Sequence, residues 1–217
     1  AVGLNAGDAL IDADYNVAVG EGALGADTYG SNSTAIGRLA LAQQNFTSAT
    51  NSENTAVGYI AGYSVTTGTN NTLIGMASGD AITTGGTNTA VGTFSLSGNT
   101  TAGNNTAVGY QALLANTTGY NNLALGANAL DANTTANNNV AVGPNSLTAN
   151  TTGAQNVAVG TACMSANTTG PDNVAMGVSA LDANTTGGSN TAIGRQALQA
   201  NTTASNNTAM GTSSMQD

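Results

Sequence analysis

The sequence predicts an all-β protein: a parallel β-solenoid (β-roll) built from copies of one 17-residue repeat. Three observations predict it, namely a constant repeat period, a short alternating strand pattern in each copy, and turn residues between the strand segments. A helix needs about 10 or more residues of helical periodicity. The recurring Gly and Asn-Thr-Thr interrupt every such run, so we expect no helices.

The glycine that ends each small–apolar–Gly motif marks the period. Eleven of the twelve intervals between these glycines are 17 residues, and the interval from Gly37 to Gly58 is 21. The glycines are Gly3, Gly20, Gly37, Gly58, Gly75, Gly92, Gly109, Gly126, Gly143, Gly160, Gly177, Gly194 and Gly211. We therefore expect thirteen coils in one repeat domain over residues 1–217, with a four-residue insertion within residues 42–54. Because the chain starts and stops within a motif, we expect a segment of a longer fibre.

Each copy contains two segments that we expect to be extended. In residues 139–143, alternation places Val140 and Val142 on one face and Ala141 on the other. Residues 112–118 represent the second segment, and Gly-x-x and Gly-x-Asn-Asn between the segments can supply turns with positive φ. The expected coil has two strands and two corners.

Stacked coils can bury apolar side chains that a single coil cannot. We expect two apolar rows in the core. One row is Val19, Ile36, Val57, Ile74, Val91 and Val108; the other is Leu113, Leu130, Leu147, Met164, Leu181 and Leu198. Repeat glycines are expected at corners, as at Gly109, Gly126, Gly143 and Gly160.

A second type of coil follows Gly3, Gly58 and Gly75. These coils lack the Leu four residues after the motif glycine and gain an apolar residue three positions later. The glycines in place of Leu are Gly7, Gly62 and Gly79, and the added residues are Leu10, Val65 and Ile82. Loss and gain occur together, which predicts a repositioned core contact.

The asparagine before each strand has a constant phase, which predicts a ladder of stacked amides along the solenoid. The ladder candidates are Asn105, Asn122, Asn139, Asn156, Asn173 and Asn190. Asn-x-Thr glycosylation signals are also frequent. They are weak evidence for glycosylation, because their density follows from the repeat.

Charge and composition exclude several functions. The net charge is −9, the basic residues are Arg38 and Arg195, and there is no His or Lys. Nucleic-acid binding needs basic side chains, so we expect no such partner. Without His or Lys, acid–base catalysis would fall to scattered carboxylates or Tyr, so we expect no enzyme, no catalytic residue and no cofactor. No apolar run approaches the ~20 residues of a membrane span.

Metal binding is also not expected. Asp12, Asp14 and Asn16 resemble the start of an EF-hand loop, but Val17 and Ala23 replace its required Gly and Glu. A cluster of thiolates and imidazoles cannot form from one Cys and no His. Cys163, which takes a position of Ala or Ser, is expected to be a small buried side chain.

Two stretches carry a family resemblance. NNTAVGYQALLANTTG at residues 104–119 and NVAVGPNSLTANTTG at residues 139–153 resemble the head repeats of YadA-type trimeric autotransporter adhesins. They are also similar to repeats of bacteriophage tail fibres. The resemblance implies a left-handed β-roll, a side-by-side homotrimer, an extracellular, cell-surface or virion location, and adhesion to host cell-surface carbohydrate. Independently, the recurring strand Ala fits close packing at a trimer axis or, equally, a tight internal corner.

We expect any ligand to meet exposed aromatic residues or the insertion. The candidate surface residues are Phe46, Glu53, Tyr59, Tyr63 and Tyr110. The insertion is expected to be a tolerated loop or, alternatively, a binding protrusion. Other functions remain open: a tail-fibre spacer without ligand binding and a self-assembling extracellular filament subunit.

A further alternative is an ice-binding solenoid. Pairs of Thr recur in consecutive coils from residues 66–67 to 202–203 and resemble the ice-binding face of antifreeze solenoids. Adjacent residues of a strand face opposite sides, so we expect only one Thr of each pair to point outward. That expectation argues against a two-row ice-binding face.

Overall fold

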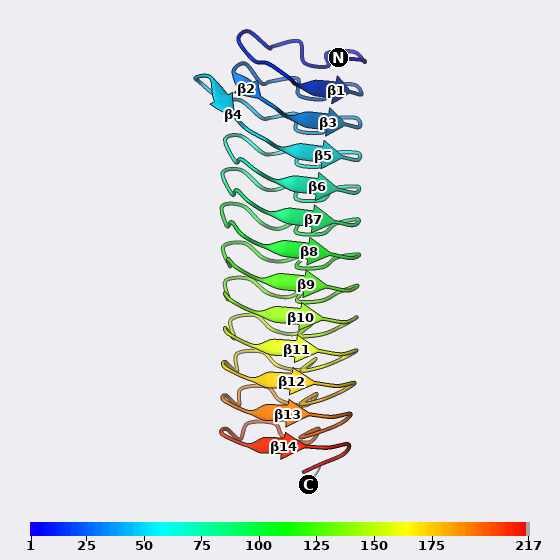
Figure 1. The fold of residues 1–217 in the computed structure, drawn as a ribbon, viewed down its shortest axis with the longest axis vertical. Coiled ribbons are helices and arrows are strands. Elements are labelled where there is room, and N and C mark those ends of the chain that lie inside the picture. The colour runs from blue at the N-terminus through cyan, green and yellow to red at the C-terminus, as the bar shows by residue number, and fades with distance from the viewer. Residues whose placement is uncertain (216–217) are drawn as a thin grey trace. The chain divides into compact units, whose positions relative to one another are not determined.

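The computed structural model describes residues 1–215 and confirms the parallel β-solenoid with 17-residue spacing. None of these residues is helical. The chain divides into two compact units, Ala1–Asn105 (unit 1) and Thr106–Asp217 (unit 2). Within each unit, successive strands lie one above the next (Figure 1). That all repeat copies form one domain stays a prediction.

Each unit contains a sheet of short parallel strands in sequence order. In unit 1 these are β1 (Val17–Val19), β3 (Thr34–Ile36), β5 (Thr55–Val57), β6 (Thr72–Ile74) and β7 (Thr89–Val91). In unit 2 they are β8 (Thr106–Val108), β9 (Leu123–Leu125), β10 (Val140–Val142), β11 (Val157–Val159), β12 (Val174–Met176), β13 (Thr191–Ile193) and β14 (Thr208–Met210). Equivalent residues are opposite each other, as Ala141 and Ala158 are.

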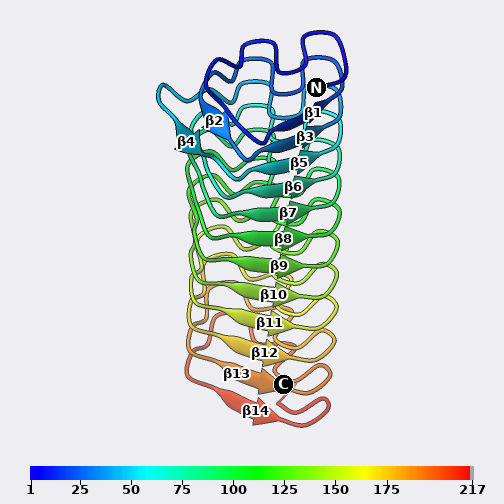
Figure 2. The ribbon, with the colours of Figure 1, turned by 45° about the horizontal axis from the view of Figure 1, so that its top comes forward.

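The expected second strand of each coil was wrong. Residues 112–118 form turns and bends rather than a strand. Gln111 and Leu113 adopt positive φ values of 54° and 56°, and a strand requires negative φ. Backbone hydrogen bonds between successive coils nevertheless continue outside the strands, since Leu113 N donates to the Ala129 carbonyl at 2.9 Å. The resulting winding coils can be followed in Figure 2.

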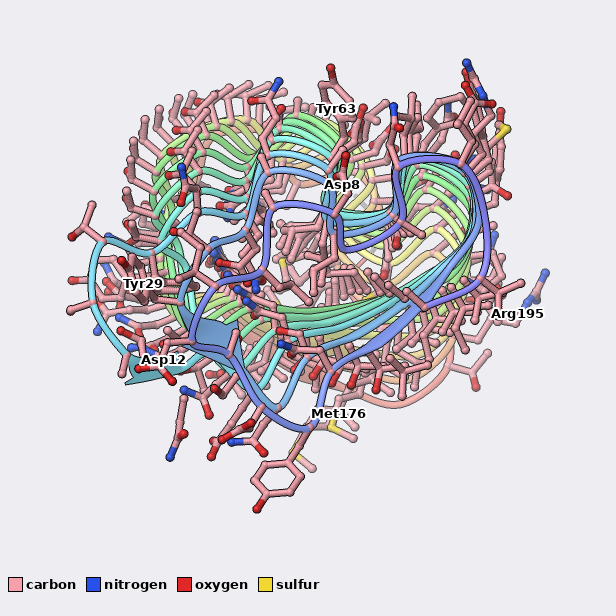
Figure 3. The ribbon with its side chains drawn as sticks, turned by 90° about the horizontal axis from the view of Figure 1, so that it is seen from above. Asp8, Asp12, Tyr29, Tyr63, Met176 and Arg195 are labelled. Atoms are coloured by element: carbon pink, nitrogen blue, oxygen red, sulfur yellow. The ribbon has the colours of Figure 1, made fainter. Side chains whose placement is uncertain are left out.

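The structure also corrects which strand face is inward. The row of Leu113 is buried as expected, but the row of Val19 and Val108 lies on the outside, exposed or half-buried. The middle residue of each strand, such as Ala141, is fully buried instead. The interior already holds the Leu row and buried Asn side chains, so little width remains for strand side chains larger than Ala. The side chain of Met176 points away from its ribbon in Figure 3.

The second coil type has the expected compensation at Val65 and Ile82, whereas Leu10 in the first coil is only half-buried. Val65 and Ile82 are fully buried, and so is Leu73, which takes the place of the usual strand Ala. A Cβ at Gly62 or at Gly79 would lie 2.7 Å from a methyl carbon of Leu73. Leu73, Val65 and Ile82 therefore occupy the core space that the missing Leu side chains leave.

The insertion is built into unit 1 rather than appended as a bare loop. It adds a two-stranded parallel pair, β2 (Gly30–Ser31) with β4 (Thr50–Asn51). Gln44 is fully buried beneath it and donates from Nε2 to Asp27 Oδ2 at 2.7 Å. Asp27 Oδ1 also accepts the backbone N–H of Gly30. The buried carboxylate is thus held by amide donors.

Candidate functional site

The outer sheet face is a regular surface feature of each unit. We define it as the first and third residues of each main-sheet strand. In unit 2 these are Thr106, Val108, Leu123, Leu125, Val140, Val142, Val157, Val159, Val174, Met176, Thr191, Ile193, Thr208 and Met210. Met176 is 44% exposed and Met210 is 69% exposed. All are apolar or Thr, so this face carries no charge.

Unit 1 has an outer sheet face of the same kind. It comprises Val17, Val19, Thr34, Ile36, Thr55, Val57, Thr72, Ile74, Thr89 and Val91. Val17, Val19, Ile36 and Ile74 are exposed. A contiguous exposed apolar surface marks an interaction site more often than a plain solvated surface.

The strand Ala residues cannot make such an interaction. Ala107, Ala124 and Ala158 are fully buried inside their own coils. Their assignment to a trimer axis is therefore wrong, and the tight internal position is the one observed. Any surface that approaches the sheet meets the Val, Ile, Leu, Met and Thr of the outer sheet face.

The asparagines before the strands are buried and bonded from coil to coil. Asn139 Oδ1 accepts the backbone N–H of Asn156 at 3.0 Å, and Asn156 Nδ2 donates to the Gly170 carbonyl at 2.9 Å. Asn105, Asn122, Asn173 and Asn190 are buried in the same row. Their amides serve the fold and do not face a ligand.

A second buried Asn row was missed by the sequence interpretation. Its members in unit 2 are Asn116, Asn133, Asn150, Asn167, Asn184 and Asn201. Asn133 Nδ2 donates to Asn116 Oδ1 at 2.8 Å. These Asn recur at the same position of each repeat, and that constant position is the sequence signal that could have revealed the row. These are the Asn of Asn-Thr-Thr. All except the half-buried Asn201 are fully buried, which keeps those amides from glycan attachment in the folded chain.

The Thr pairs point outward together, which overturns the alternation argument. Thr134 is half-buried and Thr135 is exposed, and the segment they occupy is a bend rather than a strand. Thr134 Oγ1 donates to the Thr151 carbonyl at 3.2 Å, so that hydroxyl proton serves the coil. Each pair therefore presents two neighbouring Thr side chains on the surface.

The candidate surface residues have different environments. Phe46 is only 6% exposed, so its assignment to the surface was wrong; its ring packs over Gly30, whose added Cβ would lie 2.8 Å away. Glu53 is exposed, and Tyr63 is half-buried. Tyr59 is 47% exposed and Tyr110 is 52% exposed.

Arg38 joins Tyr59 and Glu21 on one side of unit 1. Arg38 Nε lies 3.1 Å from Glu21 Oε2, and its guanidinium carbon is 5.8 Å from the Tyr59 ring centroid. The hydrogen bond to Glu21 raises the pKa of Arg38 above its ordinary value. Arg38 is thus already paired.

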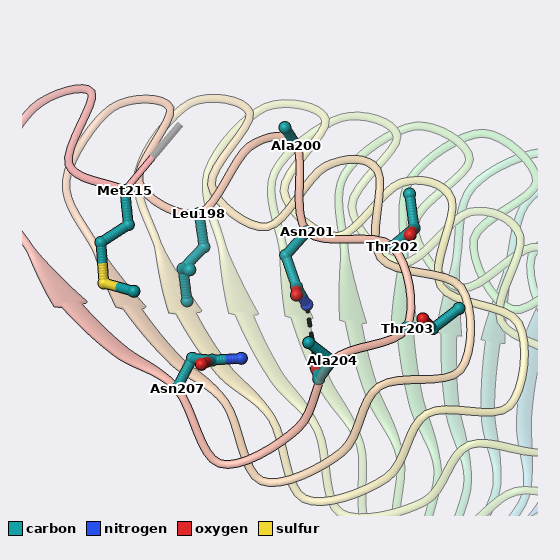
Figure 4. A pocket seen from close by; sticks show the side chains of 8 residues that line it. All are labelled: Leu198, Ala200, Asn201, Thr202, Thr203, Ala204, Asn207 and Met215. Atoms are coloured by element: carbon teal, nitrogen blue, oxygen red, sulfur yellow. Dashed lines mark hydrogen bonds between the residues drawn. The ribbon is translucent and has the colours of Figure 1, made fainter. Parts of the chain in front are cut away.

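Each unit has a surface pocket. One, of about 350 Å³, is in unit 1 and is lined by Leu39, Ile60, Tyr63, Ser64, Asp80 and Ala81. The other, of about 320 Å³, is in unit 2 and is lined by Leu198, Ala200, Asn201, Thr202, Thr203, Ala204, Asn207 and Met215 (Figure 4). In the second, Asn201 Nδ2 donates to the Ala204 carbonyl at 3.1 Å, so its polar wall is already bonded.

Residues 1–215 contain no group of three or more Asp, Glu or Cys side chains that could hold a metal ion. In the EF-hand-like segment, Asn16 Oδ1 accepts the backbone N–H of Ser33. No helix among the described residues is long and apolar enough to cross a membrane. No family model, curated protein or solved structure matches the chain. The geometry of the surfaces therefore carries the functional argument.

Proposed function

We propose that this chain is a structural and adhesive module of an extracellular fibre. In this proposal three copies pack side by side through their outer sheet faces and present a surface to host cells or their glycans. The observation that carries the proposal is the uncharged outer sheet face, with Met176 and Met210 prominent on it. Burial of such a surface stabilises an assembly by about 25 cal/mol per Å² of apolar area.

The repeat itself favours a second copy as the partner. Neighbouring parallel strands are about 4.8 Å apart, so the side chains of the outer sheet face form evenly spaced ridges. A surface with the same spacing can place its ridges in the grooves of this one along the whole contact. Another copy of the chain, aligned in parallel, has that spacing.

The two-row width of the outer sheet face favours a ring of three. In β11, Val157 and Val159 point to the same side but belong to different rows. In a cyclic trimer each chain can offer one row to each neighbour, which closes the assembly. The resemblance to trimeric adhesin and tail-fibre repeats supports this number of chains.

The test is the mass of the protein in solution at micromolar concentration, measured by sedimentation. We expect a trimer for the wild-type chain and a monomer for Met176→Lys, because the substitution places a charge in the proposed interface. Thr169→Lys, at an exposed position away from the outer sheet face, is the control and should stay trimeric. A wild-type chain that is a stable monomer refutes the trimer, and long filaments in electron micrographs would favour a polymerising subunit.

One observation favours a second candidate, ice binding. Both Thr of each pair lie on the surface, as Thr134 and Thr135 do. If this surface binds ice, the wild-type protein should show thermal hysteresis that Thr135→Lys reduces. Absence of thermal hysteresis in the wild-type protein would eliminate this candidate.

A further inference from the structure

The 350 Å³ pocket of unit 1 is lined by residues that depart from the repeat. Leu39 and Ile60 occupy the position that holds Asn128 and Asn145 in unit 2. Tyr63 is the only aromatic residue at its position in the repeat. The fold tolerates small or polar residues at these positions, so stacking of coils does not explain three large side chains at one place on the surface.

Ile60 carries backbone strain at this pocket. Its φ is 51°, in the left-handed region, where a β-branched residue is an outlier. Ile60 N donates to the Arg38 carbonyl at 3.0 Å, so the neighbouring coil holds the strained backbone in place. The equivalent residue of every coil also has a positive φ, so the backbone conformation belongs to the repeat and only the β-branched side chain is unusual here. Ile60 is half-buried at the wall of the pocket.

Asp80 places a carboxylate among the apolar groups. Its Oδ1 accepts a hydrogen bond from the Ser97 hydroxyl, and its backbone carbonyl accepts the Ser64 N–H at 3.0 Å. A carboxylate has two oxygens with about four acceptor sites, so Asp80 can accept further hydrogen bonds. Arg38, the only Arg or Lys of unit 1, is paired with Glu21. The pocket therefore combines an apolar wall, a Tyr ring and an available anionic acceptor.

We propose that this pocket is a subsite for one neutral pyranose unit of a glycan. The C–H face of a pyranose packs against the Tyr63 ring and the Leu39 and Ile60 side chains. Its hydroxyls donate charge-assisted hydrogen bonds to Asp80. The volume is at the small end of the range of about 300–1,000 Å³ for ligand pockets, which suits a single ring.

The local charge selects against acidic sugars. Asp80 has no cationic partner in the pocket, and the chain has a net charge of −9. A carboxylate or sulfate on the ligand would face like charge, which disfavours binding. This inference rests on the proposed adhesive function, whose ligand class it specifies.

The test uses saturation-transfer NMR with the whole chain and three neutral probes: the methyl pyranosides of glucose, galactose and mannose. Methyl glucuronide is the acidic comparison. We expect at least one neutral probe to bind with a dissociation constant of about 1–10 mM, and the glucuronide to bind more weakly. Tyr63→Ala and Asp80→Asn should each weaken binding about fivefold or more. Tyr63→Phe should retain most of it, and Tyr110→Ala, in unit 2, is the matched control.

Ile60→Asn keeps the test decisive if other variants unfold. Asn tolerates positive φ, so this variant should fold at least as well as the wild type and still lose sugar binding. Absence of binding by every neutral probe, or binding unchanged in Tyr63→Ala and Ile60→Asn, overturns the subsite. A trimer that binds no probe refutes the subsite alone, whereas a monomer that binds through Tyr63 supports it and refutes only the trimer.

Discussion

Asn184 donates a hydrogen bond from its side-chain amide to Oδ1 of Asn167, which lies 2.8 Å away and 17 residues earlier in the chain. Asn167 donates in turn to Asn150 Oδ1 at 2.9 Å. Both amides are fully buried. This side-chain ladder ties successive coils of unit 2 together outside the strands, where the backbone forms turns and bends.

Removal of one amide from this ladder should destabilise unit 2. In Asn167→Ala, Asn150 Oδ1 loses its donor and Asn184 Nδ2 loses one acceptor. Leaving buried polar groups unpaired costs about 1–3 kcal/mol, measured as the free energy of unfolding in urea. Thr169→Ala, at an exposed position in the same coil, is the control and should change stability by about 0.5 kcal/mol or less. Equal effects of the two substitutions would contradict the ladder's role.

The core row of Leu113 should reject β-branched residues. Leu147 is fully buried with a φ of 51°, and Met164 has the same φ in the next coil. Leu147→Val combines left-handed strain with a cavity and should lower the free energy of unfolding by about 2 kcal/mol or more. Leu147→Met should cost less than about 1.5 kcal/mol. Similar losses for Val and Met would show that φ does not select the residue type here.

The glycine corner can be tested with a matched pair. A Cβ at Gly143, where φ is 129°, would lie 2.6 Å from the carbonyl oxygen of Gly160. At Gly211, where φ is 117°, nothing lies within 4 Å of such an atom. Gly211→Ala should therefore show backbone strain alone, about 1–3 kcal/mol, and Gly143→Ala should show a larger loss in thermal or urea unfolding. A smaller loss for Gly143→Ala would mean that neighbouring coils relax around the methyl group.

Cys163 should make the free energy of unfolding decrease with pH in the alkaline range. Burial raises the pKa of its thiol to about 12, so the folded state favours the protonated form. The contribution of the buried neutral thiol to the free energy of unfolding is complete below the unfolded thiol pKa of about 8.5. This contribution is lost as pH rises toward 12. Between pH of about 7 and 10, the wild-type chain should lose more stability than Cys163→Ala, which places the Ala of other coils at this position. The native thiol should also resist alkylation until the chain unfolds; equal pH dependence in both proteins would refute the assignment.

The sequence by itself determined the coil. The spacing of the repeat glycines set the 17-residue period and the parallel register of Ala141 with Ala158, because identical residues in successive copies must stack at the same position. The paired exchange of Leu for Gly62 and of a polar residue for Val65 also showed the second coil type. These features are local or strictly periodic, so the pattern contains them.

Only the tertiary structure decided which side of each strand is inside. Alternation separates Ala107 from Val108 but is symmetric between the two faces, and hydrophobicity favoured the wrong one. The width of the coil settles the choice, because Leu113 and the buried Asn rows leave room for Ala alone. The same limit turned Val108 outward. The structure also placed the Thr pairs at a bend, with one Thr half-buried and the next exposed in most coils, and buried Phe46 within the insertion. Side-chain direction depends on where the backbone turns, and several of those turns occur at left-handed Leu residues, such as Leu113 and Leu147, which backbone propensity does not predict.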